Sequence, residues 1–396
     1  MRTIIKINNP LIIFIFFTIL GLALRIWISQ FGSNFDFAMW EANLELFKND
    51  ISIYEFGNYS YGTPWLYTLS LLDSVSLPII ENNNFVQNIP GSFYRIKIIL
   101  FLSLIDFFIF FLLCKNYSLK VGLLFFLNPI SIIITGHHNQ FSNYAILFGF
   151  LSVLLYEKNR LNFNFFIPLI LMGISLSIKH ILIFFPLWWA FKEKNLMKKF
   201  MILLIPYSIF ILSFLPFLLT ELDHIMYMLG SFGMRFDGPF WGMFGPKIVH
   251  IYLDLQTLFS FILISLGFLF INKSLKDSFY LYLMAVVAFS SMMYTQYLVI
   301  PLIALAVFWN WKYFFYTLLT FLVFLVDGDQ LNIQFLRELT NWDLRSTRIS
   351  FYPIILILLV GFIEESIGST KFNLYIKNLY IFLKDKIKSA FHFEKL

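Results

Sequence analysis

The chain has 396 residues, of which 59% are hydrophobic and only 13% are charged, and its net charge is +6 at pH 7. Since an average soluble domain is about 25% charged, this composition excludes a soluble globular enzyme and a disordered chain, and the single cysteine, Cys114, excludes a disulfide scaffold and a cysteine-based zinc site. The basic residues are scattered among apolar runs, which favours contact with lipid headgroups over nucleic acid, so the sequence predicts a membrane protein with no nucleic acid partner.

Apolar stretches follow one another along the chain at lengths near the roughly 20 residues that a helix needs to cross a bilayer. We therefore predict an all-α polytopic membrane protein with about 10–13 transmembrane helices. The candidate spans lie at roughly 11–29, 96–113, 120–135, 141–156, 162–178, 180–191, 200–219, 252–271, 279–292, 297–311, 313–326 and 349–363. The short ones, notably 180–191, are candidates for broken or re-entrant helices.

The distribution of charge predicts the orientation of these spans. With Arg2 and Lys6 on the cytoplasmic side, most lysines and arginines fall in inward loops, as in the cluster at 192–199, and most acidic residues fall outside. We expect cytoplasmic N- and C-termini in a multi-pass protein of the cell (inner) membrane. The first apolar run is longer than a signal-peptide core and no A-x-A-like site follows it, so we expect this span to be retained.

The same pattern predicts the domain organisation. Residues 1–363 form a single integral membrane domain, and residues 364–396 form a basic amphipathic cytoplasmic tail. The first outer loop, 30–95, follows the first span directly, and the helical spacing from Asp36 to Leu46 predicts an amphipathic helix at the outer interface. Because polar residues gather in the outer loops, we expect any chemistry on the extracytoplasmic side.

Two aspartates have unusual positions in this pattern. Asp36 lies a few residues past the first span among aromatic residues. A partly desolvated carboxylate there can act as a general base toward a hydroxyl group; alternatively, Asp36 is a solvated loop residue or the N-cap of the following helix. Asp106 lies within the second span, where it marks either a functional position or an ion pair or hydrogen bond between helices, and its role stays open.

A short polar turn precedes the span at 141–156. Its residues His137, His138 and Gln140 either cap the neighbouring span or contact a sugar or a phosphate. Adjacent histidines seldom share one metal ion, and no further histidine or cysteine lies at ligand spacing. We therefore expect neither a metal nor a cofactor.

Cations in the later outer segments are candidates for anion binding. Lys179 and His180 interrupt a long apolar stretch, where a lysine either extends to the interface or meets an anionic lipid headgroup. Arg235, Lys247, Arg345 and Arg348 either anchor the chain at the interface or hold a phosphate, because cationic side chains, and the arginine fork above all, bind phosphate oxygens.

The layout resembles the GT-C superfamily of polytopic glycosyltransferases over roughly residues 20–310. The late segment around Gln296 is similar to a Gln-Tyr pattern of enzymes that use polyprenyl-phosphate mannose, and Gly242-Met243-Phe244 is similar to a segment of the dolichyl-phosphate-glucose-dependent enzymes. Four other stretches carry the likeness: Phe35-Asp36-Phe37 with Tyr61-Gly62-Thr63-Pro64, Asn128-Pro129 with His137-His138-Asn139-Gln140-Phe141, Ile178-Lys179-His180-Ile181 with Pro186, and Phe240-Trp241 with Lys247.

The resemblance implies that a hexose is transferred, with inversion, from a polyprenyl-phosphate sugar to a glycan or lipid-linked oligosaccharide acceptor on the extracytoplasmic side of the bilayer. Asp36 is then the catalytic base. The implied donor- and substrate-binding residues are His137, His138, Gln140, Lys179, His180, Arg235, Trp241, Lys247, Gln296 and Arg345.

The alternative is a transporter or flippase of lipid-linked sugars. Such a protein carries charged residues at mid-membrane and often contains internal repeats. The sequence offers only Asp106 as a charge clearly inside a span and contains no visible repeat, which favours the transferase.

Overall fold

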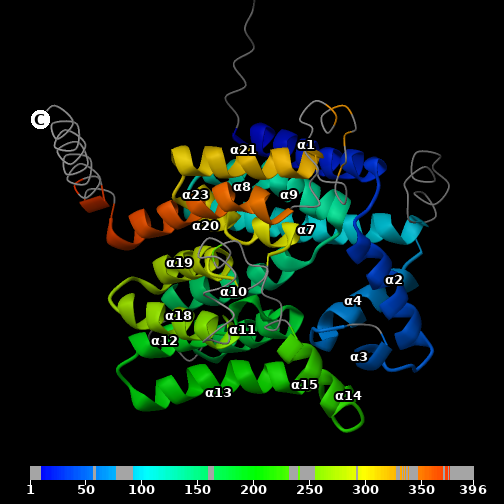
Figure 1. The fold of residues 1–396 in the computed structure, drawn as a ribbon, viewed down its shortest axis with the longest axis horizontal. Coiled ribbons are helices and arrows are strands. Elements are labelled where there is room, and N and C mark those ends of the chain that lie inside the picture. Colours follow the sequence, from blue (N-terminus) through cyan, green and yellow to red (C-terminus); the bar gives the residue numbers. More distant parts are fainter. Residues whose placement is uncertain are drawn as a thin grey trace, which may run out of the picture.

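The computed structural model describes residues 10–56, 59–76, 92–158, 165–231, 255–290, 293–326 and 347–368, with a few isolated positions besides. The described part of the chain is all-helical, with 83% helix and no strand, which confirms the predicted all-α class. The longer helices lie side by side along one direction, while α2, α3 and α4 gather at one end of the bundle (Figure 1).

The longer helices occupy most of the predicted apolar stretches. They are α1 (Pro10–Ile28), α7 (Ser92–Asn116), α10 (Ser142–Lys158), α11 (Phe166–Ile178), α13 (Leu196–Leu212), α18 (Leu255–Leu269), α19 (Leu275–Ala288), α21 (Trp311–Val326) and α23 (Thr347–Ile367). Shorter helices complete the bundle: α8 (Leu119–Phe126), α9 (Pro129–Ile133), α12 (Phe185–Lys192) and α20 (Leu302–Val307).

The connections contain further short helices. At the end of the bundle near α2 (Phe35–Lys48) lie α3 (Ile53–Phe56), α4 (Thr63–Ser74), α14 (Leu215–Leu218) and α15 (Leu222–Ser231). Single helical turns are η1 (Ser29–Phe31), η2 (Ile134–His138), η4 (His180–Leu182) and η5 (Thr295–Val299). The helix expected from Asp36 to Leu46 is therefore present as α2, which begins one residue earlier and ends two residues later than predicted.

Membrane insertion is supported by the longest apolar helices. Among the described residues, Leu11–Phe31 and Phe93–Asn116 are long and apolar enough to cross a bilayer, and the bent pair Leu119–Phe126 and Pro129–His138 brings the number to three if it forms one span. Other apolar helices are shorter, such as Trp311–Val326. The expected count of about 10–13 spans stays a prediction.

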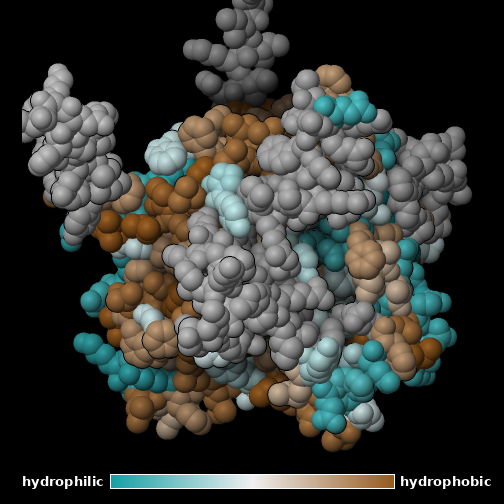
Figure 2. All heavy atoms as spheres, in the orientation of Figure 1, coloured by the Kyte–Doolittle hydropathy of each residue, from teal (hydrophilic) through white to brown (hydrophobic). Residues whose placement is uncertain are grey.

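The surface agrees with a bundle that faces lipid. Figure 2 shows hydrophobic side chains over much of the sides of the described bundle, with hydrophilic ones near α2 and α3 and, at the opposite end, near the connection between α12 and α13. Large apolar side chains on the helices that form these sides are exposed, for example Ile19, Phe108 and Phe200. In a water-soluble fold such surfaces would be covered.

Two apolar cores hold the described residues together. The larger one fills the helical bundle and includes Phe150, Trp188 and Phe279. The smaller one lies beneath α2, α3 and α4 and includes Trp40 and Trp65. The boundary between these two cores is where the candidate site lies.

Candidate functional site

Asp36 lies in the first turn of α2. Asn34 is the N-cap of this helix, because its side-chain oxygen accepts a hydrogen bond from the Asp36 backbone N–H at 3.2 Å. The alternative that Asp36 itself caps the helix is therefore wrong. Phe37 and Trp40, on the inner face of α2, are only 2% and 5% exposed, and their burial leaves the Asp36 side chain half-buried at the edge of the bundle.

The Asp36 carboxylate is connected to Lys179 through one amide. Gln140 Nε2 donates a hydrogen bond to Asp36 Oδ2 at 2.5 Å, and Lys179 Nζ donates to Gln140 Oε1 at 3.4 Å. Lys179 Nζ also donates to Ser142 Oγ at 3.0 Å. Three residues singled out in the sequence, which come from three distant segments, therefore meet at one place.

Lys179 is a buried cation among aromatic rings. Its side chain is only 3% exposed, so the alternative that it extends to the aqueous interface does not describe this structure. The ammonium lies 4.9–5.8 Å from three ring centroids, those of Phe141, Tyr61 and Tyr297. Cation–π attraction of this kind partly replaces lost hydration, but a buried ammonium still favours an anionic partner.

Burial shifts the proton equilibria of both charged groups. It lowers the pKa of the Lys179 ammonium to about 8, against the opposing effect of the Asp36 charge. Burial also raises the pKa of the Asp36 carboxyl above its ordinary value, while the Lys179 charge and the hydrogen bond from Gln140 act in the other direction. A carboxylate with a raised pKa is a stronger base than an ordinary aspartate, as general-base catalysis requires.

A break between two helices presents Lys179. Helix α11 ends at Ile178, Lys179 has an extended backbone with φ of −156°, and η4 follows directly. Tyr282 supplies hydrogen-bond partners to the interrupted backbone, because its hydroxyl donates to the Ile181 carbonyl at 3.1 Å and accepts from the Phe184 N–H at 3.2 Å. Irregular backbone in an apolar bundle needs partners of this kind. The sequence prediction of a broken helix near 180–191 agrees with this arrangement.

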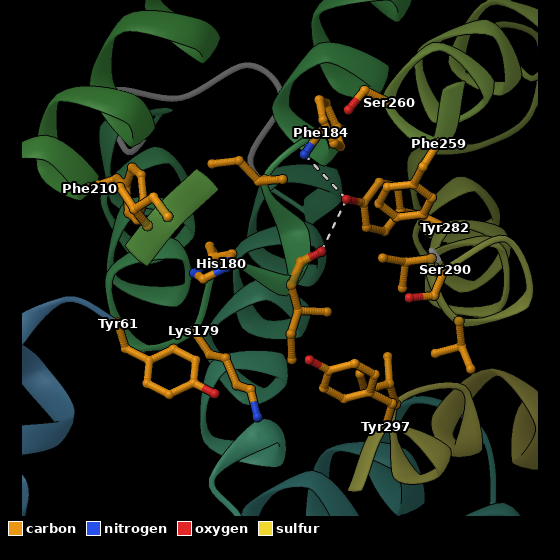
Figure 3. A pocket seen from close by; sticks show the side chains of 16 residues that line it. Tyr61, Lys179, His180, Phe184, Phe210, Phe259, Ser260, Tyr282, Ser290 and Tyr297 are labelled. Carbon is orange, nitrogen blue, oxygen red and sulfur yellow. Dashed lines mark hydrogen bonds between the residues drawn. The ribbon is translucent and has the colours of Figure 1, made fainter. Parts of the chain in front are cut away.

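Lys179 and His180 line a cavity of about 330 Å³ that continues into the bundle. Figure 3 shows the Lys179 ammonium at one end of the cavity, near the hydroxyl groups of Tyr61 and Tyr297, with Phe184 and Phe259 toward the other end. The remaining lining residues are mostly apolar and include Ile181, Ile183, Phe210, Val286, Val287 and Ile300. The cavity therefore combines a cationic, hydroxyl-bearing end with an apolar interior.

Close packing at Gly62 brings Tyr61 to the site. A Cβ atom at Gly62 would collide with the Ser177 carbonyl oxygen and with the Ser213 side chain, so only glycine allows this approach. The next residue, Thr63, donates its hydroxyl to the Ser213 carbonyl at 2.7 Å. The stretch Tyr61–Thr63 is thereby fastened to α11 and α13, beside the break at Lys179.

The two adjacent histidines lie beside the site but do not line the cavity. His137 and His138, in the single π-helical turn η2, are 1% and 0% exposed. His138 Nδ1 lies 3.3 Å from Asn34 Nδ2, and its ring packs against Phe324 at 5.3 Å. This arrangement links η2 to the cap of α2. Among the described residues, no group of three or more His, Cys, Asp or Glu side chains could hold a metal ion.

The remaining predicted site residues divide into two groups. His180 lines the cavity next to Lys179 with its ring 5.9 Å from that of Tyr61, and Gln296 is half-buried in η5, adjacent to the cavity residue Tyr297. The other predictions lie outside the described residues: Arg235, Trp241, Lys247 and Arg345.

Asp106 forms a closed ion pair. Arg25 Nη2 donates to Asp106 Oδ2 at 2.9 Å, and both side chains are 0% exposed. Thr135 Oγ1 and Asn143 Nδ2 donate to the same carboxylate at 2.6 and 2.7 Å. Of the two roles considered for Asp106, the structure therefore shows the ion pair between helices. The expectation that Asp106 is the one charge clearly inside a span is wrong, because Arg25 belongs to α1.

Sequence reasoning missed Arg25 because a basic residue near the end of a span is typical of an interface anchor. A usable signal was present, since an acidic residue inside one span requires a partner on another. Arg95, near the start of α7, was missed for the same reason.

Comparisons with known proteins give no match: no protein-family model, no curated protein and no solved structure is similar to this chain. The function of this protein is therefore inferred from the geometry and chemistry of the site, together with the resemblance of its sequence motifs.

Proposed function

We propose that this protein is a membrane glycosyltransferase of the GT-C type. It transfers a hexose, with inversion, from a polyprenyl-phosphate sugar to a glycan or lipid-linked acceptor on the extracytoplasmic side. The observation that carries the proposal is the bridge through Gln140, which joins the Asp36 carboxylate to the buried Lys179 ammonium at one end of an apolar cavity.

The cavity suits the donor because the donor is amphiphilic. Its isoprenoid chain is apolar, and its phosphodiester carries one negative charge next to the sugar. The apolar interior of the cavity offers a place for part of the chain, and the Lys179 ammonium offers a counterion for the phosphate. When the sugar leaves, the phosphate gains a second negative charge, which a preorganised cation in a site shielded from water stabilises strongly.

Asp36 supplies the base. The acceptor hydroxyl oxygen attacks the anomeric carbon while its proton passes to the Asp36 carboxylate, and the bond between the anomeric carbon and the phosphate oxygen breaks. Its electron pair leaves with the polyprenyl phosphate, and the configuration at the anomeric carbon inverts. The raised pKa of the Asp36 carboxyl supports this role.

The membrane topology belongs to the same proposal. The protein inserts with about 10–13 spans and with both termini in the cytoplasm. The shorter apolar helices belong to the same bundle as α1 and α7 (Figure 1), and the bent pair Leu119–Phe126 and Pro129–His138, with an angle of 47°, is a candidate for one divided crossing. In a divided crossing, no single helix has the length that spans a bilayer.

The experiment uses the purified full-length protein in detergent or nanodiscs with short-chain polyprenyl-phosphate glucose, mannose and related donors. Consumption of each donor is followed in the wild type, in Asp36→Asn and in the control Asp73→Asn, which makes the same change on the exposed face of α4 near Lys48. We expect one donor to be consumed, Asp36→Asn to lose about 10²–10⁴-fold of the rate, and the control to keep it.

Two results would overturn the proposal. If Asp36→Asn turns over donor like the wild type while keeping the same unfolding temperature, Asp36 is not the base. If no donor is consumed but lipid-linked sugars move across proteoliposome membranes, the protein belongs to the alternative class of transporters and flippases.

A further inference from the structure

We propose that Arg95 is a positioning residue, which locks the segment before Asp36 against the segment before Gln140 and thereby fixes the distance between the base and its amide partner. We call the five hydrogen bonds from Arg95 to residues 29–32 and 136–139 the Arg95 clamp. Its consequence for catalysis rests on the function proposed above.

Arg95 reaches both segments from a third element. It lies near the start of α7 and is 0% exposed. Toward the Asp36 side, Nη1 donates to the Ser29 carbonyl at 2.9 Å and Nη2 donates to the Gly32 carbonyl at 2.5 Å. The guanidinium carbon also lies 5.7 Å from the ring centroid of Phe37, the residue after Asp36.

The same guanidinium holds the segment that leads to Gln140. Nη2 donates to the carbonyls of Gly136 and His137, both at 3.2 Å, and Nε donates to Asn139 Oδ1 at 2.8 Å. One side chain therefore bonds to backbone or side-chain oxygens within seven residues of Asp36 on one segment and within four residues of Gln140 on the other.

The backbone at these places needs such a partner. Gly32 has φ of +110° and Asn139 has φ of +57°, conformations that end regular helical hydrogen bonding. The carbonyls next to these turns lack the partners that a continuing helix would supply, and buried carbonyls without donors are costly. Arg95 provides donors to these carbonyls, so its loss would loosen both turns together. Two of them also accept longer bonds of 3.4 Å, the His137 carbonyl from the Asn34 N–H and the Gly136 carbonyl from Asn139 Nδ2.

A lysine could not replace this clamp fully. The guanidinium offers five N–H donors in a planar fork, whereas an ammonium offers three donors around one atom. The five acceptors around Arg95 are spread over two chain segments. We therefore expect Arg95→Lys to retain the charge but only part of the clamp.

The first test measures the clamp without relying on catalysis. Peptide-resolved hydrogen–deuterium exchange of the full-length protein compares the wild type with Arg95→Met, Arg95→Lys and the control Lys97→Met. Lys97 is also a buried cation of α7, but it donates to the Asp73 carbonyl, away from the site. We expect exchange in 29–36 and 134–140 to be about tenfold faster or more in Arg95→Met, intermediate in Arg95→Lys and unchanged in Lys97→Met.

The outcome of this test is decisive in either direction. Faster exchange in both segments, with the core peptides of α19 unaffected, supports a local clamp. Unchanged exchange in the two segments, or an equal increase throughout the protein, would overturn it. If the wild type consumes no sugar donor, the proposed function fails while this measurement still decides whether Arg95 locks the two segments.

The second test asks whether Arg95 acts through Asp36. We expect Arg95→Met to lower kcat by roughly 100-fold, the scale of a misplacement of about 1 Å, with little change in the KM for donor. Added to Asp36→Asn, the same substitution should cause no further loss, because residues that act as a unit are not additive. A multiplicative loss in the double variant, or an unchanged kcat in Arg95→Met, would overturn the positioning role.

Discussion

Two aspartates of this protein are each connected to a buried cation, and they differ in what remains for a substrate. Asp106 accepts hydrogen bonds on both carboxylate oxygens from donors such as Arg25, Thr135 and Asn143. Asp36 accepts from Gln140 on Oδ2, and the described residues show no donor to its Oδ1. Both oxygens of the Asp106 carboxylate therefore accept hydrogen bonds within the protein, whereas one oxygen of the Asp36 carboxylate accepts none from the described residues.

The comparison also concerns the distance between charges. Arg25 contacts Asp106 directly, so the two charges neutralise each other at 2.9 Å. Lys179 is separated from Asp36 by the Gln140 amide, so each charge is only partly compensated by the other. An ionisable residue inside a span is a functional candidate by default, yet here the ion pair inside the candidate spans is closed by partners within the protein, and the candidate base lies in the first turn of α2, past the end of the first span.

The largest expected effect is on stability, at the closed pair. Arg25→Met should lower the free energy of unfolding by about 3–5 kcal/mol, because it leaves the buried Asp106 carboxylate without its counterion. Thermal unfolding in detergent measures the loss. Asp36→Asn, which removes no such pair, should leave the unfolding temperature nearly unchanged.

A paired replacement serves as the control. Arg25→Met combined with Asp106→Leu should recover much of the stability, since replacing both partners of a buried ion pair by apolar residues is often neutral. If the double variant is as unstable as Arg25→Met alone, the pair has a role beyond neutralising its own charges, and the contrast with Asp36 would weaken.

The next effect concerns the affinity of the site at Asp36 and Lys179 for the sugar donor. Lys179→Met should weaken binding of a short-chain polyprenyl phosphate about 10–100-fold, because a hydrogen bond to a charged group contributes about 1.5–3 kcal/mol. Isothermal titration calorimetry in detergent provides the measurement, with Lys48→Met on the exposed face of α2 as the matched control. An unchanged affinity in Lys179→Met would place the donor phosphate elsewhere.

The smallest effect is on the pH dependence of kcat/KM. Activity should rise with pH as Asp36 loses its proton, with this acid limb above the range of an ordinary aspartate because burial raises its pKa. Activity should fall again as pH passes about 8, where Lys179 loses its proton. In Lys179→Arg the basic limb should disappear, since a guanidinium stays protonated. A basic limb that persists in this variant would assign it to another group.

The helices and the candidate base could be predicted from the sequence because both depend on local patterns. Apolar runs of roughly bilayer length predict helices wherever they occur, and α1, α7, α10 and α21 follow them closely. The break at Lys179 was visible as the polar dipeptide Lys179-His180 inside an apolar run, and Asp36, Gln140 and Lys179 were selected by residue type, position and resemblance.

The contacts among these residues were not visible, because no spacing rule connects distant helices. Asp36 and Gln140 are 104 residues apart, and Arg25 and Asp106 are 81 residues apart. Arg95 in particular resembles an ordinary interface anchor until the turns at Gly32 and Asn139 are seen to point their oxygens at it. The apolar runs of the sequence thus decided that the chain is helical and where its polar residues gather. Helix packing alone decided which charged side chains are paired within the protein and which are available to a substrate. The reason is that a charge is neutralised by whichever partner the fold brings within a few ångströms.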